Sequence, residues 1–253
     1  MLSKRKFKEI SALQIKKFRT ENGLFLAEGE KIVDELLESE LMIQTLIATP
    51  KWIGLHKEGS VKCTELIDAP AEELKKISLL KTPNQVIAVV NIPKYDFKIS
   101  RLKEKLAVVL DEIQDPGNLG TIIRICDWFG INQIICSNSS VDAYNPKVVQ
   151  ASMGSIFRVK IEYAELSNWL SSYRKSYSYP IFGAFLQGDD IYKESLSSKG
   201  LIILGNESKG ISEEIEKFVS QKIFIPRFAS SGADSLNVAV AAAILCSEFR
   251  RRK

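Results

Sequence analysis

Histidine is nearly absent from this sequence, and cysteine is sparse and scattered. His56 is the only histidine, and the four cysteines, Cys63, Cys126, Cys136 and Cys246, lie far apart and form no C-x-x-C pair. A single histidine cannot anchor a metal site alone, and cysteines scattered over apolar segments are typical of reduced thiols in a core. We therefore expect no bound metal and no disulfide.

Long apolar runs are also lacking. No stretch of about 18 apolar residues is present that could cross a membrane, and the N-terminal residues MLSKRK do not have the pattern of a secretory signal. The 45% of hydrophobic and 26% of charged residues are typical of a globular protein. From these features we expect a cytoplasmic protein whose 253 residues form two domains.

Two nucleotide-binding motifs are incomplete. Gly205 and Gly210 have the G-x-x-x-x-G spacing of a phosphate-binding P-loop, but Ile211 and Ser212 follow where that motif requires lysine and then serine or threonine. No two glycines lie two residues apart, so the G-x-G-x-x-G turn of a dinucleotide-binding fold cannot occur. These absences argue against a P-loop ATPase and against a Rossmann dehydrogenase.

Basic residues concentrate at the two ends of the chain. The first 20 residues contain seven lysines and arginines against one acidic residue, Glu9, and the chain ends in RRRK, although its net charge is only +4. Basic ends on a near-neutral body indicate a polyanionic partner, and nucleic acid is the common one. The alternative is a pair of solvated tails that only increase solubility.

The N-terminal part alternates between helical and β-rich segments. Hydrophobic periodicity predicts a helix over residues 5–19, ended by Asn22-Gly23. The same reading predicts strands at 24–27, 43–48, 61–66 and 86–90 and helices at 31–39, 51–57 and 71–78. This alternation predicts a compact α/β unit.

A second α/β unit is predicted after a linker. Its expected strands are 106–110, 133–136, 158–161, 180–185, 200–204 and 222–226, and its expected helices are 119–129, 146–153, 166–175 and 236–249. The apolar run LAVVL at 106–110 is typical of a central parallel strand, so we expect a mainly parallel sheet with helices on both faces. Two polar loops, after residues 204 and 226, are expected to end neighbouring strands. The predicted organisation is a domain over residues 1–95, a linker over 96–105 and a domain over 106–253.

Three segments together resemble a known family. They are DPGNLGTIIR at 115–124, LGNESKGIS at 204–212, and IP at 225–226 followed by SLNVAVA at 235–241. In this order and at these separations they look like the three motifs of the SpoU (TrmH-like) branch of the SPOUT RNA methyltransferases. The N-terminal segment resembles the family's substrate-binding domain through Arg19, Phe25-Leu26 and Glu28-Gly29.

The resemblance implies a fold, an activity and partners. The family has a catalytic α/β domain with a deep C-terminal trefoil knot, here preceded by a small L30e-like α/β domain, and it forms homodimers through the C-terminal helix. It transfers a methyl group from S-adenosylmethionine to a ribose 2′-hydroxyl of RNA, and this architecture implies ribosomal (23S) RNA as the substrate. Transfer RNA is one alternative substrate, and an RNA-binding homologue without activity is another alternative.

The resemblance also assigns site residues. It implies that backbone groups of the knot hold the cofactor, at positions that match Leu204, Gly205, Asn206, Gly210, Ile225 and Leu236. The implied catalytic set is Asn118, Arg124, Glu207, Ser235 and Asn237, and its presence argues against an inactive homologue. Without the resemblance, Asn118 and Ser235 would be interpreted as helix caps and Glu207 as a surface carboxylate.

Arg124 has two interpretations. The family's arginine at this position has been cast as the base, but a guanidinium stays protonated up to a pH of about 12. We prefer a clamp on the phosphate next to the target ribose, which would also stabilise developing alkoxide charge. Asn118 and Glu207 would orient Arg124 and the nucleotide, and Ser235 and Asn237 would bind phosphate or ribose.

Two departures from the family pattern concern loops. Ser208 stands where the family usually has glycine, and the segment between Pro226 and Ser235 is about two residues longer than is common in the family. We expect these changes to affect the loop conformation and the nucleotide that fits against residues 228–234.

Overall fold

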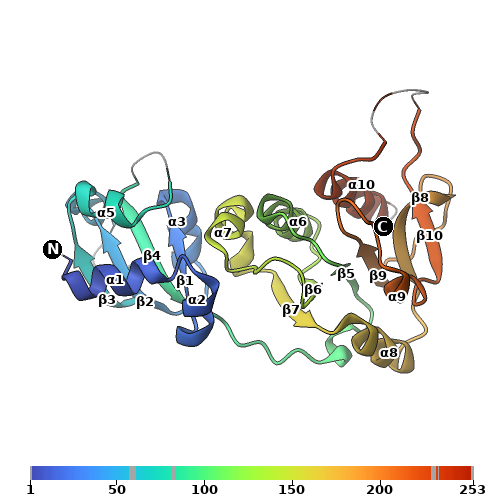
Figure 1. Cartoon of the computed structure of the whole chain (residues 1–253), viewed down its shortest axis with the longest axis horizontal. Helices are drawn as coiled ribbons and strands as arrows, with labels where there is room; N and C mark the ends of the chain where they lie inside the picture. The colour runs from blue at the N-terminus through green and yellow to red at the C-terminus, as the bar shows by residue number, and fades with distance from the viewer. Residues whose placement is uncertain (1, 57–60, 81–83, 229–231, 233, 252–253) are drawn as a thin grey trace. The chain divides into compact units, whose positions relative to one another are not determined.

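The computed structural model describes residues 2–56, 61–80, 84–228, 232 and 234–251. Contacts divide the chain into two compact units (Figure 1). The first unit comprises Met1–Lys94 together with Asp142–Arg158, and the second comprises Tyr95–Val141 and Val159–Lys253. The grouping of residues 142–158 with the first unit differs from the sequence-based organisation, which assigned them to the domain over residues 106–253.

The first unit contains a four-stranded sheet in the order β1-β4-β2-β3. Strand β4 pairs antiparallel with β1 and β2, whereas β2 and β3 are parallel. The strands are β1 (Leu24–Glu28), β2 (Ile43–Ala48), β3 (Cys63–Asp68) and β4 (Val86–Asn91). The helices are α1 (Lys4–Ala12), α2 (Lys16–Asn22), α3 (Glu30–Leu37), α4 (Pro50–Leu55), α5 (Ala71–Ile77) and α7 (Pro146–Ser152), with the short 3₁₀ helix η2 (Ser155–Phe157). Residue 57, the predicted end of one helix, lies outside the described residues.

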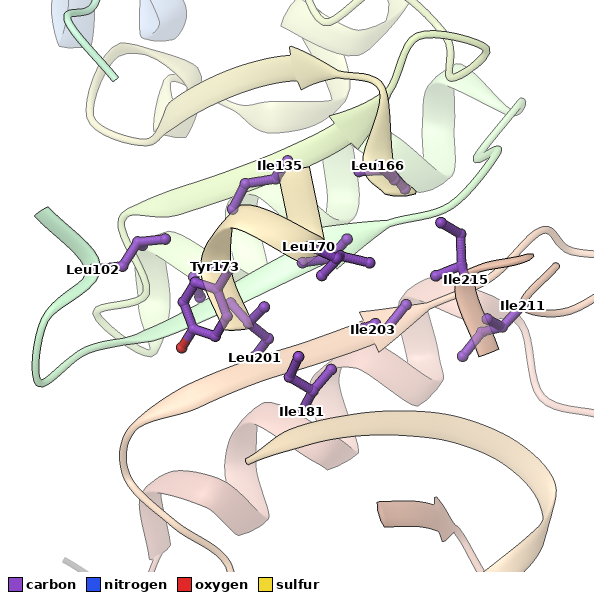
Figure 2. Packing of buried hydrophobic residues seen from close by; sticks show 12 residues of the cluster. Leu102, Ile135, Leu166, Leu170, Tyr173, Ile181, Leu201, Ile203, Ile211 and Ile215 are labelled. Atoms are coloured by element: carbon purple, nitrogen blue, oxygen red, sulfur yellow. The ribbon is translucent and has the colours of Figure 1, made fainter. Parts of the chain in front are cut away.

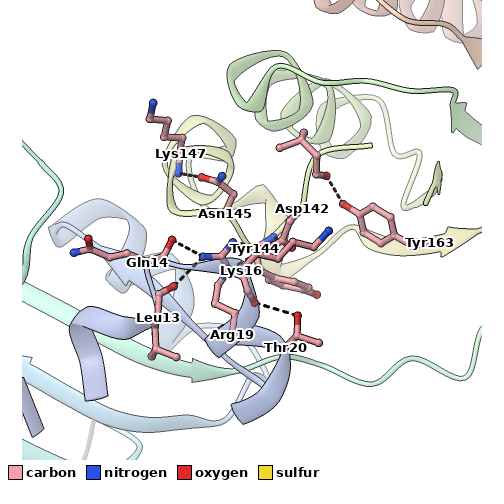
Figure 3. Close-up of polar contacts among 11 residues, drawn as sticks. Leu13, Gln14, Lys16, Arg19, Thr20, Asp142, Tyr144, Asn145, Lys147 and Tyr163 are labelled. Carbon is pink, nitrogen blue, oxygen red and sulfur yellow. Dashed lines mark hydrogen bonds and ion pairs between the residues drawn. The ribbon is translucent and has the colours of Figure 1, made fainter. Parts of the chain in front are cut away.

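The helix predicted over residues 5–19 is wrong in one respect, because it is two helices. The chain turns after α1, which leaves the carbonyl oxygens of Leu13 and Gln14 without a helical partner. The guanidinium of Arg19 donates to both oxygens at 2.9 Å (Figure 3). It also pairs with the carboxylate of Asp142, at 2.6 and 2.9 Å.

Arg19 therefore differs from the other basic residues near the N-terminus. Its side chain is 2% exposed, so it cannot be part of a basic surface that contacts RNA. Its partner Asp142 precedes α7, which packs against β1 within the same unit. The buried ion pair thus ties residues 142–158 to the first unit, although the chain reaches them from β6 of the second unit.

The second unit contains a six-stranded sheet in the order β10-β8-β9-β5-β6-β7, in which every neighbouring pair is parallel. The strands are β5 (Leu106–Leu110), β6 (Gln133–Ser137), β7 (Lys160–Ala164), β8 (Ile181–Asp190), β9 (Gly200–Leu204) and β10 (Gln221–Phe224). The helices are α6 (Pro116–Trp128), α8 (Leu166–Ser176), α9 (Glu213–Glu216) and α10 (Val238–Arg251), and a 3₁₀ helix, η1 (Ile99–Leu102), lies in the predicted linker.

The parallel sheet of the second unit is confirmed, but the prediction that the loops after residues 204 and 226 end neighbouring strands is wrong. Strand β8 lies between β9 and β10. The neighbour of β9 on its other side is β5, and the two strands pair from Leu106 opposite Gly200 to Leu110 opposite Leu204. The loops that lie side by side are therefore those after β5 and β9.

Helices cover both faces of this sheet. On one face, Leu201 and Ile203 of β9 pack with Leu170 and Tyr173 of α8 in a buried apolar cluster (Figure 2). On the other face, Phe182 of β8 meets Phe249 of α10 with ring centroids 4.8 Å apart. Because alternate residues of a strand point to opposite faces, the central strands β5 and β9, which are buried on both faces, consist of apolar residues and glycine.

Candidate active site

The site begins where β5 and β9 end together. Their ladder closes with a hydrogen bond from the amide of Asp111 to the oxygen of Leu204, at 2.9 Å. Carboxyl ends of parallel strands are where ligands bind in open α/β sheets. The two segments that leave this edge are the 111–115 loop, which leads into α6, and the 205–212 loop, which leads towards α9.

The 205–212 loop is a tight turn closed by its own backbone. Asn206 and Gly210 exchange two main-chain hydrogen bonds of 2.9 Å. Gly210 has φ of +73°, a conformation that glycine adopts without strain. A Cβ atom on Gly205 would lie 2.1 Å from the carbonyl carbon of Gly210, so no larger residue fits there without moving the turn. Both glycines are thus required by the shape of the loop.

The side chain of Asn206 is engaged at both ends. Its Oδ1 accepts hydrogen bonds from the amides of Ser208 and Lys209, at 3.0 and 3.1 Å. Its Nδ2 donates to the carbonyl oxygen of Glu112, at 2.8 Å. The first contacts shape the turn, and the last one joins the two loops. The polar groups of this side chain are therefore occupied by the chain itself, and the expectation that Asn206 holds the cofactor concerns its backbone groups.

Each backbone amide of the 111–115 loop has a partner. After Asp111, the amides of Glu112 and Ile113 donate to Ser137 Oγ and Ser140 Oγ, at 2.9 and 3.2 Å. The amides of Gln114 and Asp115 donate to the carboxylate of Glu207, at 3.5 and 3.3 Å. Glu112 is held at φ of +58°, which costs a residue with a Cβ on the order of 1 to 2 kcal/mol. Contacts from both sides hold this strained backbone in place.

Side chains from all three sequence motifs form a chain of hydrogen bonds. The side-chain nitrogen Nδ2 of Asn237 donates to Asn118 Oδ1 at 2.9 Å, and Nδ2 of Asn118 donates to Glu207 Oε1 at 2.9 Å. Since Glu207 also accepts from two backbone amides, its carboxylate is fixed by three donors. Asn118, Glu207 and Asn237 were predicted together from the sequence, and the structure brings them into contact.

The helix caps differ from those considered from the sequence. Asp115, not Asn118, caps α6, because its Oδ1 accepts from the amide of Asn118 at 2.8 Å. The cap at the start of α10 is Asn237, not Ser235, since Asn237 Oδ1 accepts from the amides of Ala239 and Val240. Asn118 lies inside the first turn of α6 and its side chain is therefore free to bridge Glu207 and Asn237.

Two members of the predicted catalytic set stand apart. Arg124 is exposed on α6, and its guanidinium makes no hydrogen bond or ion pair with any described residue, including Asn118 and Glu207. The expected orientation of Arg124 by these two residues is therefore absent within one chain. Ser235 is also exposed and makes no hydrogen bond within the described part of the chain.

The remaining positions suit a ligand that is read by main-chain groups. Leu204 is buried and its oxygen is used by Asp111, whereas the backbone groups of Gly205, Ile225 and Leu236 make no hydrogen bond to another backbone group of the described residues. Gly205 and Ile225 follow the carboxyl ends of two strands that both run parallel to β8. Free donors and acceptors at these positions fit an adenine edge, which requires both.

Further expectations from the sequence concern metal ions, thiols and membrane spans. Among the described residues, no group of three or more His, Cys, Asp or Glu side chains is placed to hold a metal ion. All four cysteines are free thiols, as predicted, and Cys126, Cys136 and Cys246 are buried. Within the same described ranges, no helix is both long and apolar enough to cross a membrane.

Sequence reasoning missed the residues that support the 111–115 loop. Asp111 is buried, and its Oδ2 accepts from the amide of Ser212 at 2.8 Å, which adds another contact between the two loops. Ser137, the last residue of β6, and Ser140, in the turn after it, supply the hydroxyls for Glu112 and Ile113. The available signal was their position, since all three lie at or just after the carboxyl ends of buried parallel strands.

Known proteins match this chain over its whole length. Residues 105–247 match the SpoU rRNA methylase family, and residues 4–88 match the MRM3-like substrate-binding domain. The chain is 30% identical to RlmP of Bacillus subtilis, a 23S rRNA guanosine 2′-O-methyltransferase, over 97% of this chain and 96% of that protein.

Solved structures agree with these matches. A TrmH-family protein from Porphyromonas gingivalis is 36% identical, with a TM-score of 0.90 over 100% of both chains. AviRb of Streptomyces viridochromogenes, a SpoU methyltransferase solved with its cofactor S-adenosylmethionine, is 27% identical, with a TM-score of 0.86 over 99% of this chain and 98% of that one. With three motifs joined at one edge of its sheet, the chain belongs to the SpoU rRNA methylase family.

Proposed function

We propose that this protein transfers the methyl group of S-adenosylmethionine to a ribose 2′-hydroxyl of ribosomal RNA, which it would meet in the cytoplasm. The observation that carries the proposal is the hydrogen-bonded chain of Asn237, Asn118 and Glu207, because it joins the three family motifs. The relatives named as 23S rRNA 2′-O-methyltransferases support the substrate. Transfer RNA is the alternative substrate, with the same chemistry on another RNA.

The residues present would hold the cofactor through main-chain groups. Gly205, Ile225 and Leu236 would read the adenine, and Leu204 and Gly210 would frame the turn beside it. When bound, the cofactor supplies a methyl group on a positively charged sulfur, which a hydroxyl oxygen can attack in line. Alignment of the attacking oxygen with that methyl group can supply much of the rate.

The catalytic residues then act on the RNA. Asn118, fixed between Glu207 and Asn237, holds the nucleotide through its exposed edge. Arg124 carries a permanent positive charge and a planar set of donors, so it suits the phosphate next to the target ribose and the charge that develops on the oxygen. Ser235 and Asn237 lie just before α10, and their polar side chains would bind phosphate or ribose. The proton leaves through the phosphate or through water.

We further propose that the active protein is a homodimer formed through α6 and α10. These helices pack on each other and carry exposed apolar side chains, of which Trp128 is 82% exposed and Val240 is 48% exposed. Arg124 and Trp128 are one helical turn apart and lie on the same side of α6. A partner on this side would contact Arg124, which would explain why Arg124 has no contact within one chain.

The finer features of the fold belong to the same proposal. The second unit would carry the family's C-terminal trefoil knot. The first unit would be an L30e-like domain that binds RNA through the exposed residues Lys4, Arg5 and Lys8 of α1 and Lys16 and Lys17 of α2. We keep the predicted boundaries of 1–95, 96–105 and 106–253 as a division of the sequence into domain, linker and domain. In the structure, residues 142–158 of the last range pack with the first unit.

Methyl transfer tests the proposal directly. The purified protein is incubated with S-adenosylmethionine that carries a labelled methyl group and with either ribosomal or transfer RNA, in buffer with and without a metal chelator. The account predicts label on a ribose of ribosomal RNA, unaffected by the chelator. Label only in transfer RNA would support the alternative, and label in neither RNA would contradict the activity.

A further inference from the structure

The side-chain amide of Asn206 in the 205–212 loop reaches a backbone oxygen of the 111–115 loop. Its Nδ2 donates to the carbonyl oxygen of Glu112 at 2.8 Å, while its Oδ1 accepts from Ser208 and Lys209 within its own turn. One end of the side chain therefore belongs to the turn expected to border the cofactor. The other end holds the loop that leads to Asn118.

The residue that Asn206 holds is itself unusual. Glu112 has a positive φ of 58°, although it has a Cβ atom. Its amide is fixed from the opposite side by Ser137 Oγ, at 2.9 Å. A backbone conformation of this kind persists only where its surroundings determine it, and such positions cluster at functional sites. Loss of the contact to Asn206 would leave the Glu112 carbonyl free to rotate.

The conformation of Glu112 decides where the next amides point. Gln114 and Asp115 follow directly and donate their amides to the carboxylate of Glu207. Glu207 in turn accepts from Asn118 Nδ2, which continues to Asn237. A rotation at Glu112 would therefore misplace the donors that fix Glu207 and, through it, the side chain of Asn118.

We propose that Asn206 is a positioning residue: it transmits the conformation of the cofactor turn to the 111–115 loop and so holds Glu207 and Asn118 in place for methyl transfer. This inference deepens the proposed function and rests on it. It differs from a direct contact between Asn206 and the cofactor, because it assigns the side chain to the alignment of the RNA-binding residues.

Asn206→Asp separates the two roles. Aspartate keeps an acceptor for the amides of Ser208 and Lys209, so the turn is retained, but a carboxylate cannot donate to the oxygen of Glu112 and repels it. Asn168→Asp is the matched control, since Asn168 is an exposed residue of α8 whose side chain makes no hydrogen bond among the described residues. The control adds the same charge without changing the loops.

Two measurements are made on the full-length protein. In single-turnover methyl transfer to ribosomal RNA with saturating cofactor, Asn206→Asp should lower the rate at least tenfold, which corresponds to about 1.4 kcal/mol or more. Calorimetry should give a cofactor dissociation constant within about threefold of the wild-type value. Asn168→Asp should change neither value. A weakened cofactor affinity with a normal saturated rate, equal loss of both, or no change in either would overturn the proposal.

Hydrogen exchange provides a readout that does not need activity. The amides of residues 112–115 should exchange at least tenfold faster in Asn206→Asp than in wild type or Asn168→Asp, because their partners would no longer be held. Unchanged exchange there would overturn the inference whether or not the protein methylates RNA. If exchange is faster in Asn206→Asp but the wild-type protein methylates no RNA, the proposed function fails and the positioning role of Asn206 stands.

Discussion

The side-chain nitrogen Nδ2 of Asn118 donates a hydrogen bond of 2.9 Å to Glu207 Oε1, although the two residues are 89 positions apart in the chain. Asn118 lies in the first turn of α6, and Glu207 lies in the turn after β9. Their contact depends on the adjacency of β5 and β9 in the sheet, which places the two loops side by side.

Glu207→Gln should lower the rate of methyl transfer and leave the affinity for the cofactor unchanged. Glutamine has one acceptor oxygen where glutamate has two, so it cannot accept from Asn118 and from the amides of both Gln114 and Asp115. Loss of hydrogen bonds to a charged group costs roughly 1.5 to 3 kcal/mol, which corresponds to a rate reduction of about tenfold to a hundredfold. Single-turnover rates and cofactor calorimetry measure the two quantities. Equal loss in both would assign Glu207 to cofactor binding.

Substitutions of Arg124 should lower the methylation rate strongly, although its side chain is exposed. As a phosphate clamp it needs both its charge and its planar donors, so Arg124→Lys should lower the methylation rate strongly and Arg124→Ala more strongly, with cofactor affinity unchanged. If Arg124 were a base, Arg124→Lys would retain activity with a pH profile shifted to lower pH. Single-turnover rates over a pH series separate these roles, and a normal rate in Arg124→Ala would remove Arg124 from the site.

Arg19 should be needed for stability rather than for RNA affinity. Arg19→Met removes the cation from the partly buried Asp142 and leaves Asp142 Oδ2 and two carbonyl oxygens without the donor they have in wild type, a change that costs about 3 to 5 kcal/mol. Arg5→Met is the control, because Arg5 forms an exposed pair with Glu9 that contributes about 0 to 1 kcal/mol. Urea unfolding measures both changes. A loss of RNA affinity in Arg19→Met with unchanged stability would return Arg19 to the RNA-binding surface.

Trp128 should be needed for assembly. Its side chain is 82% exposed, so Trp128→Ala should leave the monomer fold intact, while loss of an aromatic anchor costs a dimer 2 kcal/mol or more. The control is Leu186→Ala, since Leu186 is an exposed apolar residue of β8 outside the proposed interface. Light scattering at micromolar concentration should show a dimer for wild type and Leu186→Ala, and a monomer for Trp128→Ala. A wild-type monomer of 28.4 kDa would refute the dimer.

The cysteines should react in two classes. Burial raises the pKa of the Cys136 thiol, and the pKa of the Cys126 thiol is raised because this thiol donates a hydrogen bond to Cys246 and is itself buried. The pKa of Cys63 is raised less strongly by its partial burial. Because the thiolate is the reactive form, a thiol reagent at pH 8 should label Cys63 slowly and the buried thiols only after unfolding. Rapid labelling of Cys126 in the folded protein would contradict its burial between α6 and α10.

The sequence predicted what depends on local pattern and on short motifs. Strand β5 was found because its run of buried apolar residues is typical of a central parallel strand, and Asn118, Glu207 and Asn237 were found because each lies in a family motif. The order of the strands was not found, since the position of β8 between β9 and β10 is set by packing and not by any local signal.

The burial of individual polar side chains could also not be predicted from the sequence. Arg19 was counted among exposed basic residues, because a basic segment of a helix is usually solvated and nothing near it in the sequence shows that Asp142 will be its partner. The role of Asn118 was likewise divided between helix cap and catalytic residue. The structure shows that Asp115 caps α6, which leaves the side chain of Asn118 available for Glu207 and Asn237.

The most direct measurement of the central claim is a map of ribose 2′-O-methylation in the ribosomal RNA of cells that naturally produce this protein. Three strains are compared: wild type, a strain that lacks this protein, and that strain supplied with the Asn118→Ala variant, whose production is checked by immunoblot. The account predicts one ribosomal ribose that is methylated in wild type and unmethylated in the other two strains. Full methylation of every ribosomal site in the strain that lacks the protein would contradict it.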